Sequence, residues 1–182
     1  MTRLVAFLRG INVGSRVVKK ERLEEAFTAL GFRSVATYKQ SGNVIFDSEG
    51  ADIGEVRARI ETKLRKTLGY EVPVFIRAIP ELKAIIEQYF RPVGEGTSLL
   101  VTFVPVGASK FTLPLPLIIP KSTVEMYSSS GSEFFSLTHG GGEGGLPNQF
   151  LESKLKMKAT TRNMKVIKEI VEKFGQGSHR TP

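Results

Sequence analysis

The order in which the apolar residues change their spacing constrains the fold of this chain more than any other feature. Short apolar runs typical of strands alternate with segments in which apolar residues recur at i, i+3, i+4 and i+7, the spacing of one helix face. In the first half of the chain, strands are expected at Arg3–Leu8, Ser34–Lys39, Asn43–Asp47 and Val72–Ala78, and helices at residues 23–30 and 52–68. This order is βαββαβ, the split βαβ pattern of ferredoxin-like folds.

For the second half of the chain, the sequence predicts a smaller group of strands and helices. A helix that begins near Pro80 precedes this group. Strands are expected at Ser98–Val104, Thr123–Tyr127 and Phe134–Thr138, an edge strand or extended loop at Leu113–Ile119, and helices from about Pro147 and Arg162. We therefore predict an α+β protein. It has a ferredoxin-like subdomain at residues 1–92, a second α+β subdomain packed against it at residues 93–175, and a flexible tail at residues 176–182.

Composition narrows the class of protein. The 182 residues are 41% apolar, which is enough to build one core or two that share a boundary, and disorder is not expected. Because the chain has no cysteine, disulfide scaffolds, thiol catalysis and cysteine zinc sites are excluded. The apolar run Leu4–Leu8 is broken by Arg9, and no apolar stretch approaches the roughly 20 residues needed to span a bilayer. We expect a cytoplasmic protein that does not bind membranes.

Two polar segments are expected to meet at one edge of the first sheet. In a βαββαβ unit the third strand lies antiparallel between the first two, so the end of the first strand and the hairpin between the next two share an edge. The segments are Arg9–Gly14 and Tyr38–Asn43. The first helix also begins at this edge, where its N–H groups favour anions. The candidate ligand-binding residues here are Arg9, Asn12, Gln40, Ser41 and Asn43.

A structural role is the alternative for each of these residues. Glycine in such turns permits a positive φ, and Asn or Ser side chains in loops often bond to their own backbone. A third segment, Lys158–Asn163, is expected to open the last helix with Thr161 as N-cap, and Arg162 would then face the same anion. Here the alternative is a capped helix with a solvated arginine.

Three motifs in this order resemble a known family. They are Leu8–Gly14, Tyr38 together with Gln40–Phe46, and Thr160–Asn163, and they resemble the domain of unknown function 1697 family of bacterial and archaeal proteins. The resemblance spans nearly the whole chain and implies an α+β protein of two subdomains, the first ferredoxin-like. It implies no activity, so it identifies no catalytic residue. The family usually has a second glycine where this chain has Ser15.

Few residues in this sequence are suited to catalysis or to metal binding. A Ser–His–Asp triad would have to use His139 or His179, and a hydrolase that pairs His139 with Ser41 is the weakest alternative. The glycine-rich residues 140–145 lack the Lys-Ser/Thr ending of a P-loop, so they are expected to form a flexible loop or a lid. We predict no metal site and no cofactor, and the catalytic residues, if any, are not identified.

The leading functional hypothesis follows from the two polar loops and the net charge of +8. We expect a binding protein whose polar cleft takes a phosphate-bearing small molecule or nucleotide. One alternative is a nucleic-acid-binding module that uses basic helix surfaces, with Lys63, Arg65 and Lys66 in contact with phosphates. The other is an enzyme of unknown reaction that uses the same cleft and needs a proton-transfer group near Ser41 or Tyr38. The sequence does not indicate an oligomeric state.

Overall fold

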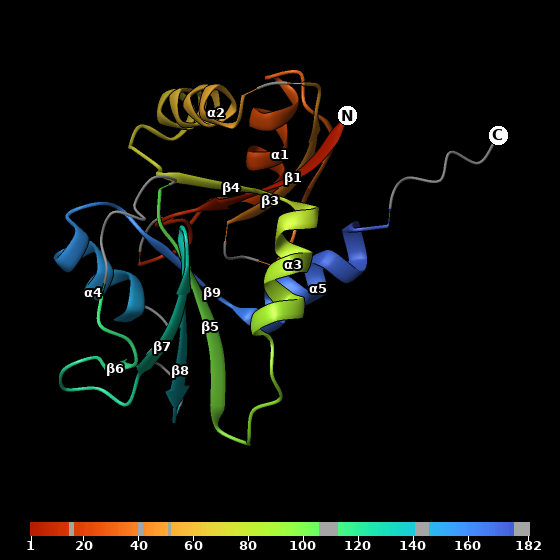
Figure 1. Ribbon diagram of the computed structural model, residues 1–182. Helices are drawn as coiled ribbons and strands as arrows, with labels where there is room; N and C mark the ends of the chain where they lie inside the picture. The colour runs from red at the N-terminus through yellow and green to blue at the C-terminus, as the bar shows by residue number, and fades with distance from the viewer. Residues whose placement is uncertain (15–16, 40–41, 51, 106–112, 141–145, 177–182) are drawn as a thin grey trace. The chain divides into compact units, whose positions relative to one another are not determined.

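The chain folds into two compact units. A computed structural model describes residues 1–14, 17–39, 42–50, 52–105, 113–140 and 146–176 (Figure 1). Unit 1 comprises Met1–Leu82 together with Ile170–Pro182, and unit 2 comprises Lys83–Glu169. Unit 2 is therefore inserted, in sequence, between two parts of unit 1.

Unit 1 contains a four-stranded antiparallel sheet and the helices that connect its strands. Its elements are β1 (Thr2–Leu8), α1 (Lys20–Thr28), β2 (Arg33–Thr37), β3 (Asn43–Ser48), α2 (Ile53–Leu68) and β4 (Val74–Ala78). The strand order is β2-β3-β1-β4, and every neighbouring pair is antiparallel. The predicted element order βαββαβ is confirmed, and β3 lies between β1 and β2 as the split βαβ pattern requires.

Local signals in the sequence explain where α2 begins and ends. The side chain of Asp52 accepts a hydrogen bond from the Glu55 N–H, which satisfies one of the donors left open at a helix N-terminus. Gly69 ends the helix in the left-handed conformation, at φ 82°. One face of the helix buries Val56, Ile60 and Leu64 against the sheet, so the apolar spacing read from the sequence is the packing face.

The central strand β1 is buried along its apolar run. All five residues from Leu4 to Leu8 are at most 2% exposed. Leu4 and Leu8 belong to the cluster that also contains Phe27 of α1 and Phe46 of β3. Because successive side chains of a strand point to opposite faces, both faces of this sheet are covered at β1. An open sheet face of the kind that stacks RNA bases is therefore not present at this strand.

Unit 2 contains a five-stranded antiparallel sheet in the order β6-β7-β8-β5-β9. Its strands are β5 (Thr97–Phe103), β6 (Leu117–Ile118), β7 (Glu125–Ser130), β8 (Glu133–His139) and β9 (Thr160–Asn163). Helix α4 (Leu146–Leu155) belongs to unit 2. Helices α3 (Ile79–Tyr89) and α5 (Met164–Phe174) are each divided between the two units, with α3 passing from unit 1 into unit 2 and α5 returning from unit 2 to unit 1. The short β6 pairs with β7 alone, so the proline-rich segment forms an edge strand, as expected.

The two faces of the second sheet have different partners. Phe134, Met126 and Val104 pack against Leu151 and Leu155 of α4. On the other face Phe135 stacks on Tyr89, with ring centroids 3.8 Å apart. Both neighbouring phenylalanines of β8 are thus buried in the unit 2 core.

The predicted last helix is present, but it begins at Met164 rather than near Arg162, and the predicted N-cap, Thr161, is wrong. Residues Thr160–Asn163 form β9, which pairs with β5, and α5 begins at Met164. Thr161 is not the N-cap, because its hydroxyl bonds to Thr102 and Asn148 instead. Asn163 takes the capping role, with its Oδ1 accepting a hydrogen bond from the Lys165 N–H at 2.8 Å. The β-branched Thr160 and Thr161 favour the edge strand that the helical interpretation overlooked.

Three sequence predictions concern residues for which little or no structure is described. Of the predicted lid or loop at residues 140–145, residues 141–145 lie outside the described residues, and so do residues 177–182 of the predicted tail at 176–182. Gln40 and Ser41 also lie outside them. Among the described helices, none is long and apolar enough to cross a membrane.

Candidate functional site

The two polar loops of unit 1 converge as the topology predicts. The N–H of Leu8, at the end of β1, donates a hydrogen bond of 2.8 Å to the carbonyl oxygen of Gly42 in the hairpin. Gly42 has a φ of +69°, and a Cβ on it would lie 3.1 Å from the Cβ atoms of Leu8 and Ile11. Only glycine satisfies both the backbone conformation and this close approach. Gly42 is thus the point at which the hairpin is held against the end of β1.

Asn12 holds the loop between β1 and α1. Its Oδ1 accepts a hydrogen bond from the Val18 N–H at 2.7 Å, and its backbone has a φ of 56°. Asn is one of the few residues other than glycine that adopts this conformation at low cost. The side chain therefore fixes the approach to α1, which begins after Lys19 without a side-chain cap.

Asn43 and Tyr38 close the hairpin between β2 and β3. The Nδ2 of Asn43 donates to the Tyr38 carbonyl at 3.0 Å, and the Tyr38 N–H donates to the Asn43 carbonyl at 3.0 Å. Asn43 is fully buried, so these bonds replace contacts with water. Next to this turn, Glu24 of α1 accepts hydrogen bonds from both the N–H and the hydroxyl of Thr37, which ties the helix to the end of β2.

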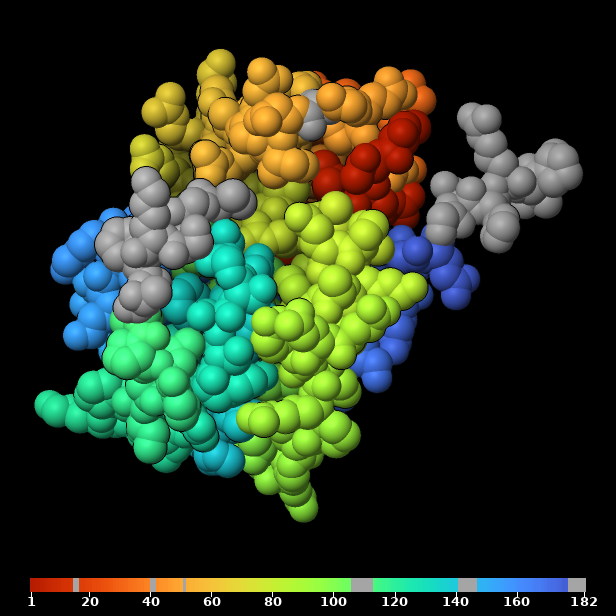
Figure 2. Space-filling view, viewed as in Figure 1, coloured from red at the N-terminus to blue at the C-terminus, as the bar shows by residue number. Residues whose placement is uncertain are grey.

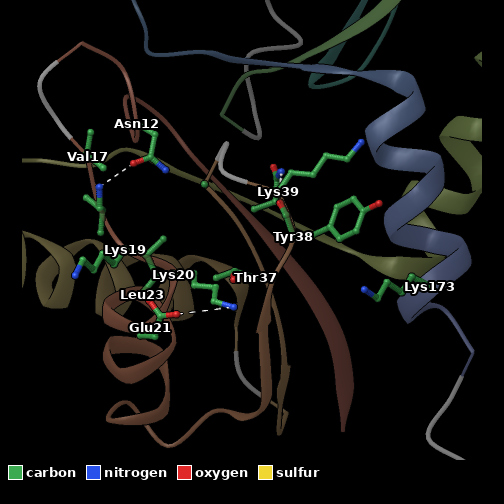
Figure 3. Close-up of a pocket in the computed structure, with 13 residues that line it drawn as sticks. Asn12, Val17, Lys19, Lys20, Glu21, Leu23, Thr37, Tyr38, Lys39 and Lys173 are labelled. Carbon is green, nitrogen blue, oxygen red and sulfur yellow. Dashed lines mark hydrogen bonds and ion pairs between the residues drawn. The ribbon is translucent and has the colours of Figure 1, made fainter.

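A pocket of about 710 Å³ lies where these segments meet (Figure 3). Its lining comes from the segment before α1 (Asn12, Val17, Val18 and Lys19), from α1 (Lys20, Glu21 and Leu23), from the hairpin (Thr37, Tyr38, Lys39, Gly42 and Asn43) and from Lys173 near the end of α5. All of these residues belong to unit 1. The volume is within the range of small-molecule sites.

The lining of this pocket is strongly basic. Four lysines stand against one glutamate, Glu21, so the lining side chains carry a net charge of 4 − 1 = +3. Glu21 lies 3.8 Å from the ammonium nitrogen of Lys20. The Nζ atoms of Lys39 and Lys173 each lie 5.5 Å from the centroid of the Tyr38 ring, which favours cations over its face. The same ring forms a T-shaped pair with the Phe174 ring, with ring centroids 6.0 Å apart.

The residues predicted to bind the ligand have different positions in the structure. Asn12 and Asn43 line the pocket, and each also makes a bond that holds its own loop. Arg9 is half-buried, its N–H donates to the Pro73 carbonyl at 2.9 Å, and it is not part of the lining. Gln40 and Ser41 lie outside the described residues. Their predicted role in ligand binding therefore stays a prediction.

Arg162 occupies a buried position in unit 2. It is 8% exposed, and its Nη1 donates to the Thr160 hydroxyl at 2.8 Å and to the Thr161 carbonyl at 2.9 Å. Burial lowers the pKa of Arg162 to about 10, so the guanidinium remains protonated at neutral pH. The structural alternative for Arg162, a solvated side chain at the start of a helix, is therefore wrong.

The basic character of the site comes from residues that the sequence reasoning assigned to a solvated helix face or did not use. Lys20 is the first residue of α1 and Lys19 precedes it. Lys39 lies in the hairpin, and Lys173 comes from the far end of the chain. Lys39 has a φ of 55°, a conformation that a lysine adopts at a cost of about 1–2 kcal/mol. A signal for the first three was available, because they flank the two polar loops. None pointed to Lys173.

Among the described residues, the side chains that could bind a metal or transfer a proton do not indicate a second functional site. Within that part of the chain, no group of three or more His, Asp or Glu side chains is placed to hold a metal ion. His139 lies at the end of β8, where its Nδ1 is 3.0 Å from the Thr97 hydroxyl. The partner considered for it, Ser41, is outside the described residues.

Fold and site together define an α+β protein with two antiparallel sheets and a basic pocket in its first unit. The family model described as a protein of unknown function (DUF1697) matches residues 1–112, and the chain belongs to this family. Among solved structures, the conserved bacterial protein SP0830 from Streptococcus pneumoniae is similar, with a TM-score of 0.68 and 21% sequence identity. The alignment covers 97% of this chain and 99% of that one. No curated protein sequence matches the chain.

Proposed function

We propose that the protein binds a phosphate-bearing small molecule in the basic pocket of unit 1. One observation carries the proposal: the lining of a pocket large enough for a metabolite includes four lysines and one glutamate. Like charges gathered around a partly enclosed space raise the local concentration of anions and stabilise them once bound. The ligand's phosphate accepts hydrogen bonds from lysine ammonium groups.

The other residues that line the pocket can hold such a ligand in one orientation. Asn12 and Asn43 keep their loops in place, and Tyr38 offers an aromatic ring to a sugar or base. The proposal retains Gln40 and Ser41 as hydrogen-bond donors from the same hairpin. A pocket with few fixed polar groups and some apolar surface, here from Val18 and Leu23, is typical of small-molecule sites.

The test is a thermal-shift screen of the purified chain against nucleotides and sugar phosphates, followed by calorimetry on each hit at two salt concentrations. A ligand that binds only the folded state raises the melting temperature with its concentration. We expect Lys39→Gln to weaken binding by about tenfold, since a hydrogen bond to a charged group contributes about 1.5–3 kcal/mol.

The matched control is Lys83→Gln, which removes the same charge from an exposed position of α3 outside the pocket. We expect this variant to bind like the wild type. Equal weakening by both substitutions would mean that net charge alone attracts the ligand, and the pocket would then lose its assigned role.

A second candidate function, nucleic-acid binding by α2, is favoured by one surface feature. Arg59, Lys63 and Lys66 recur at the spacing of one helix face and line a shallow groove of about 380 Å³. None of the described residues that line this groove is acidic. Side chains of α2 form part of the molecular surface in Figure 2. Against this function, Arg59 donates a hydrogen bond to the carbonyl of Leu30, which follows α1, so this arginine already has a structural partner.

Charge reversal separates the two functions. If α2 binds nucleic acid, Lys63→Glu with Arg65→Glu and Lys66→Glu abolishes oligonucleotide binding, and the wild-type affinity falls steeply with salt. The same triple variant leaves small-molecule binding in the pocket unchanged. Fluorescence anisotropy with a labelled oligonucleotide at 50 and 200 mM salt measures both effects.

A further inference from the structure

The groove on α2 brings positive charges together without acidic neighbours. This α2 groove is lined by Leu30, Ala58, Arg59, Thr62, Lys63 and Lys66. Its three cations stand at positions i, i+4 and i+7 of the helix, where like charges destabilise one another, and a solvated helix face normally alternates acidic with basic residues. Within the part of the chain that the structure describes, neither Lys63 nor Lys66 forms an ion pair. Both lysines are therefore available to an anionic partner from outside the chain.

Apolar surface lies beside these cations. Leu30 and Ala58 line the groove, and Thr62 adds a methyl group. Ala58 and Thr62 are exposed on the helix surface. An apolar centre bordered by charged groups is typical of protein interfaces, in which one buried side chain anchors the partner. With a volume of about 380 Å³, the groove is large enough for such an apolar side chain.

Two features favour a protein over a nucleic acid as the partner. None of the described lining residues is aromatic, so the groove offers no ring on which a base could stack. Arg59 already donates to the Leu30 carbonyl oxygen at 2.6 Å, which leaves two lysines of the groove for anions. This is fewer than the roughly six to ten phosphate contacts of a protein whose DNA binding depends strongly on salt. A short segment with a few carboxylates matches the groove better.

We propose that the α2 groove binds an acidic segment of a partner protein. An apolar side chain of that segment packs against Leu30, Ala58 and Thr62, and its carboxylates lie at Lys63 and Lys66. The carboxylates supply the complementary charge, and the apolar side chain fixes the position of the segment along α2. The groove and the basic pocket share no lining residue, so this proposal goes beyond the proposed function and does not depend on it.

Two peptides of equal charge test the proposal. The probe is a synthetic peptide of repeated Glu-Glu-Leu units, and the comparison peptide has serine in place of every leucine. Each is titrated into the isotope-labelled full chain, and the backbone amide chemical shifts are followed by NMR. We expect saturable shifts at Ala58 and Lys66. The leucine peptide is expected to bind about tenfold or more tightly than the serine peptide, because it buries an apolar side chain in the groove.

Three single variants locate the peptide. Lys63→Gln is expected to weaken binding of the leucine peptide by about tenfold, since it removes a charged hydrogen-bond donor. Arg65→Gln removes the same charge from α2 outside the groove and keeps the wild-type affinity. Ala58→Lys covers the apolar surface and adds a positive charge at an exposed helix position. We expect this variant to bind the leucine peptide more weakly, whereas attraction by net charge alone would strengthen binding.

The remaining outcomes overturn the proposal. Equal affinity for the leucine and serine peptides, or tighter binding by Ala58→Lys, would show that charge alone attracts the peptide. Absence of saturable shifts with the leucine peptide would show that the groove does not take such a segment. A single-stranded and a duplex oligonucleotide are titrated in the same way. Tighter binding of either one at the groove residues would assign the groove to nucleic acid.

Discussion

At the scale of single residues, the pocket depends on one position where a side chain does not fit. Gly42 lies against Leu8 and Ile11 with a φ of +69°. We predict that Gly42→Ala lowers the free energy of unfolding by about 2–3 kcal/mol, because the methyl group adds a steric contact to the cost of the left-handed backbone. Urea denaturation followed by circular dichroism measures the change.

Gly69 provides the matched control for this substitution. It also has a positive φ, +82°, but no atom lies within 4 Å of the position that its Cβ would take. Gly69→Ala is therefore expected to lose only the conformational part, about 1 kcal/mol. An equal effect of the two substitutions would show that the contact with β1 contributes nothing.

Lys39 is a second residue whose backbone conformation conflicts with its type. Its φ of 55° is left-handed, and such strain often persists where a side chain serves a function. We predict that Lys39→Gly is at least as stable as the wild type, because relief of about 1–2 kcal/mol of strain offsets the entropy that glycine loses on folding. The same variant binds phosphate compounds more weakly. Thermal denaturation and calorimetry on one preparation give both results.

At the scale of the elements, α5 depends on a cap supplied by a strand. Asn163 is the last residue of β9, and its side chain accepts a hydrogen bond from the second residue of the helix. We predict that Asn163→Ala lowers the stability by about 1 kcal/mol and that Asn163→Asp retains it, since a carboxylate also caps and suits the helix dipole. Chemical denaturation of the three proteins is the measurement; an unchanged midpoint in the alanine variant contradicts the prediction.

This junction also shows where sequence reasoning reaches its limit. The order of elements in unit 1 was predictable because α2 has its cap at Asp52 and its stop at Gly69, and because β1 contains the unbroken apolar run Leu4–Leu8. The strand β9 has four residues and owes its conformation to pairing with β5, some sixty residues earlier in the sequence. Local spacing holds no information about such a partner.

The candidate site was predictable to a similar extent. The meeting of the two polar loops follows from topology, and the bond between Leu8 and Gly42 confirms it. The lysines that make the pocket basic were harder to assign, since a lysine beside a helix start looks the same whether it faces solvent or a cavity. Lys173 enters the pocket only because the chain returns to unit 1 after residue 169.

At the scale of the whole molecule, one ion pair makes stability depend on pH. Arg3 of β1 donates to both carboxylate oxygens of Asp47 in β3, at 2.6 and 2.9 Å, and its Nη1 also reaches the Phe174 carbonyl at 3.5 Å. Partial burial raises the pKa of Asp47, but hydrogen bonds from Arg3 and Ser34 and the Arg3 charge outweigh it, so the pKa lies below its usual value. The pair thus joins the first strand to its neighbour and to the C-terminal segment.

The direction of the pKa shift determines the pH dependence. Because the folded-state pKa of Asp47 is lowered, its stabilisation is fully present above the unfolded-state pKa of about 3.9 and is lost as the pH falls through the folded-state value. We predict that Asp47→Asn is less stable than the wild type by about 1–3 kcal/mol at pH 7 and that this difference shrinks below pH 4. Urea titrations at pH 7, 5 and 3 measure it.

Glu49 supplies the control for this prediction. Its ion pair with Arg33 is 3.6 Å long, and both side chains are 68% exposed. Solvent and salt screen such a pair, so Glu49→Gln is expected to change the stability by less than about 0.5 kcal/mol at any of these pH values. A constant difference between Asp47→Asn and the wild type at all three pH values would contradict the assigned linkage.

The insertion of unit 2 within unit 1 has a consequence for the synthesis of the protein. Asn12, Tyr38 and Lys39 are made early, whereas Lys173, from the same pocket, is made after the whole of unit 2. A nascent or prematurely terminated chain that stops within unit 2 contains the residues of the first sheet and most of those that line the pocket, yet lacks Lys173. For the ligand proposed above, we therefore expect full affinity only in chains that extend past residue 173.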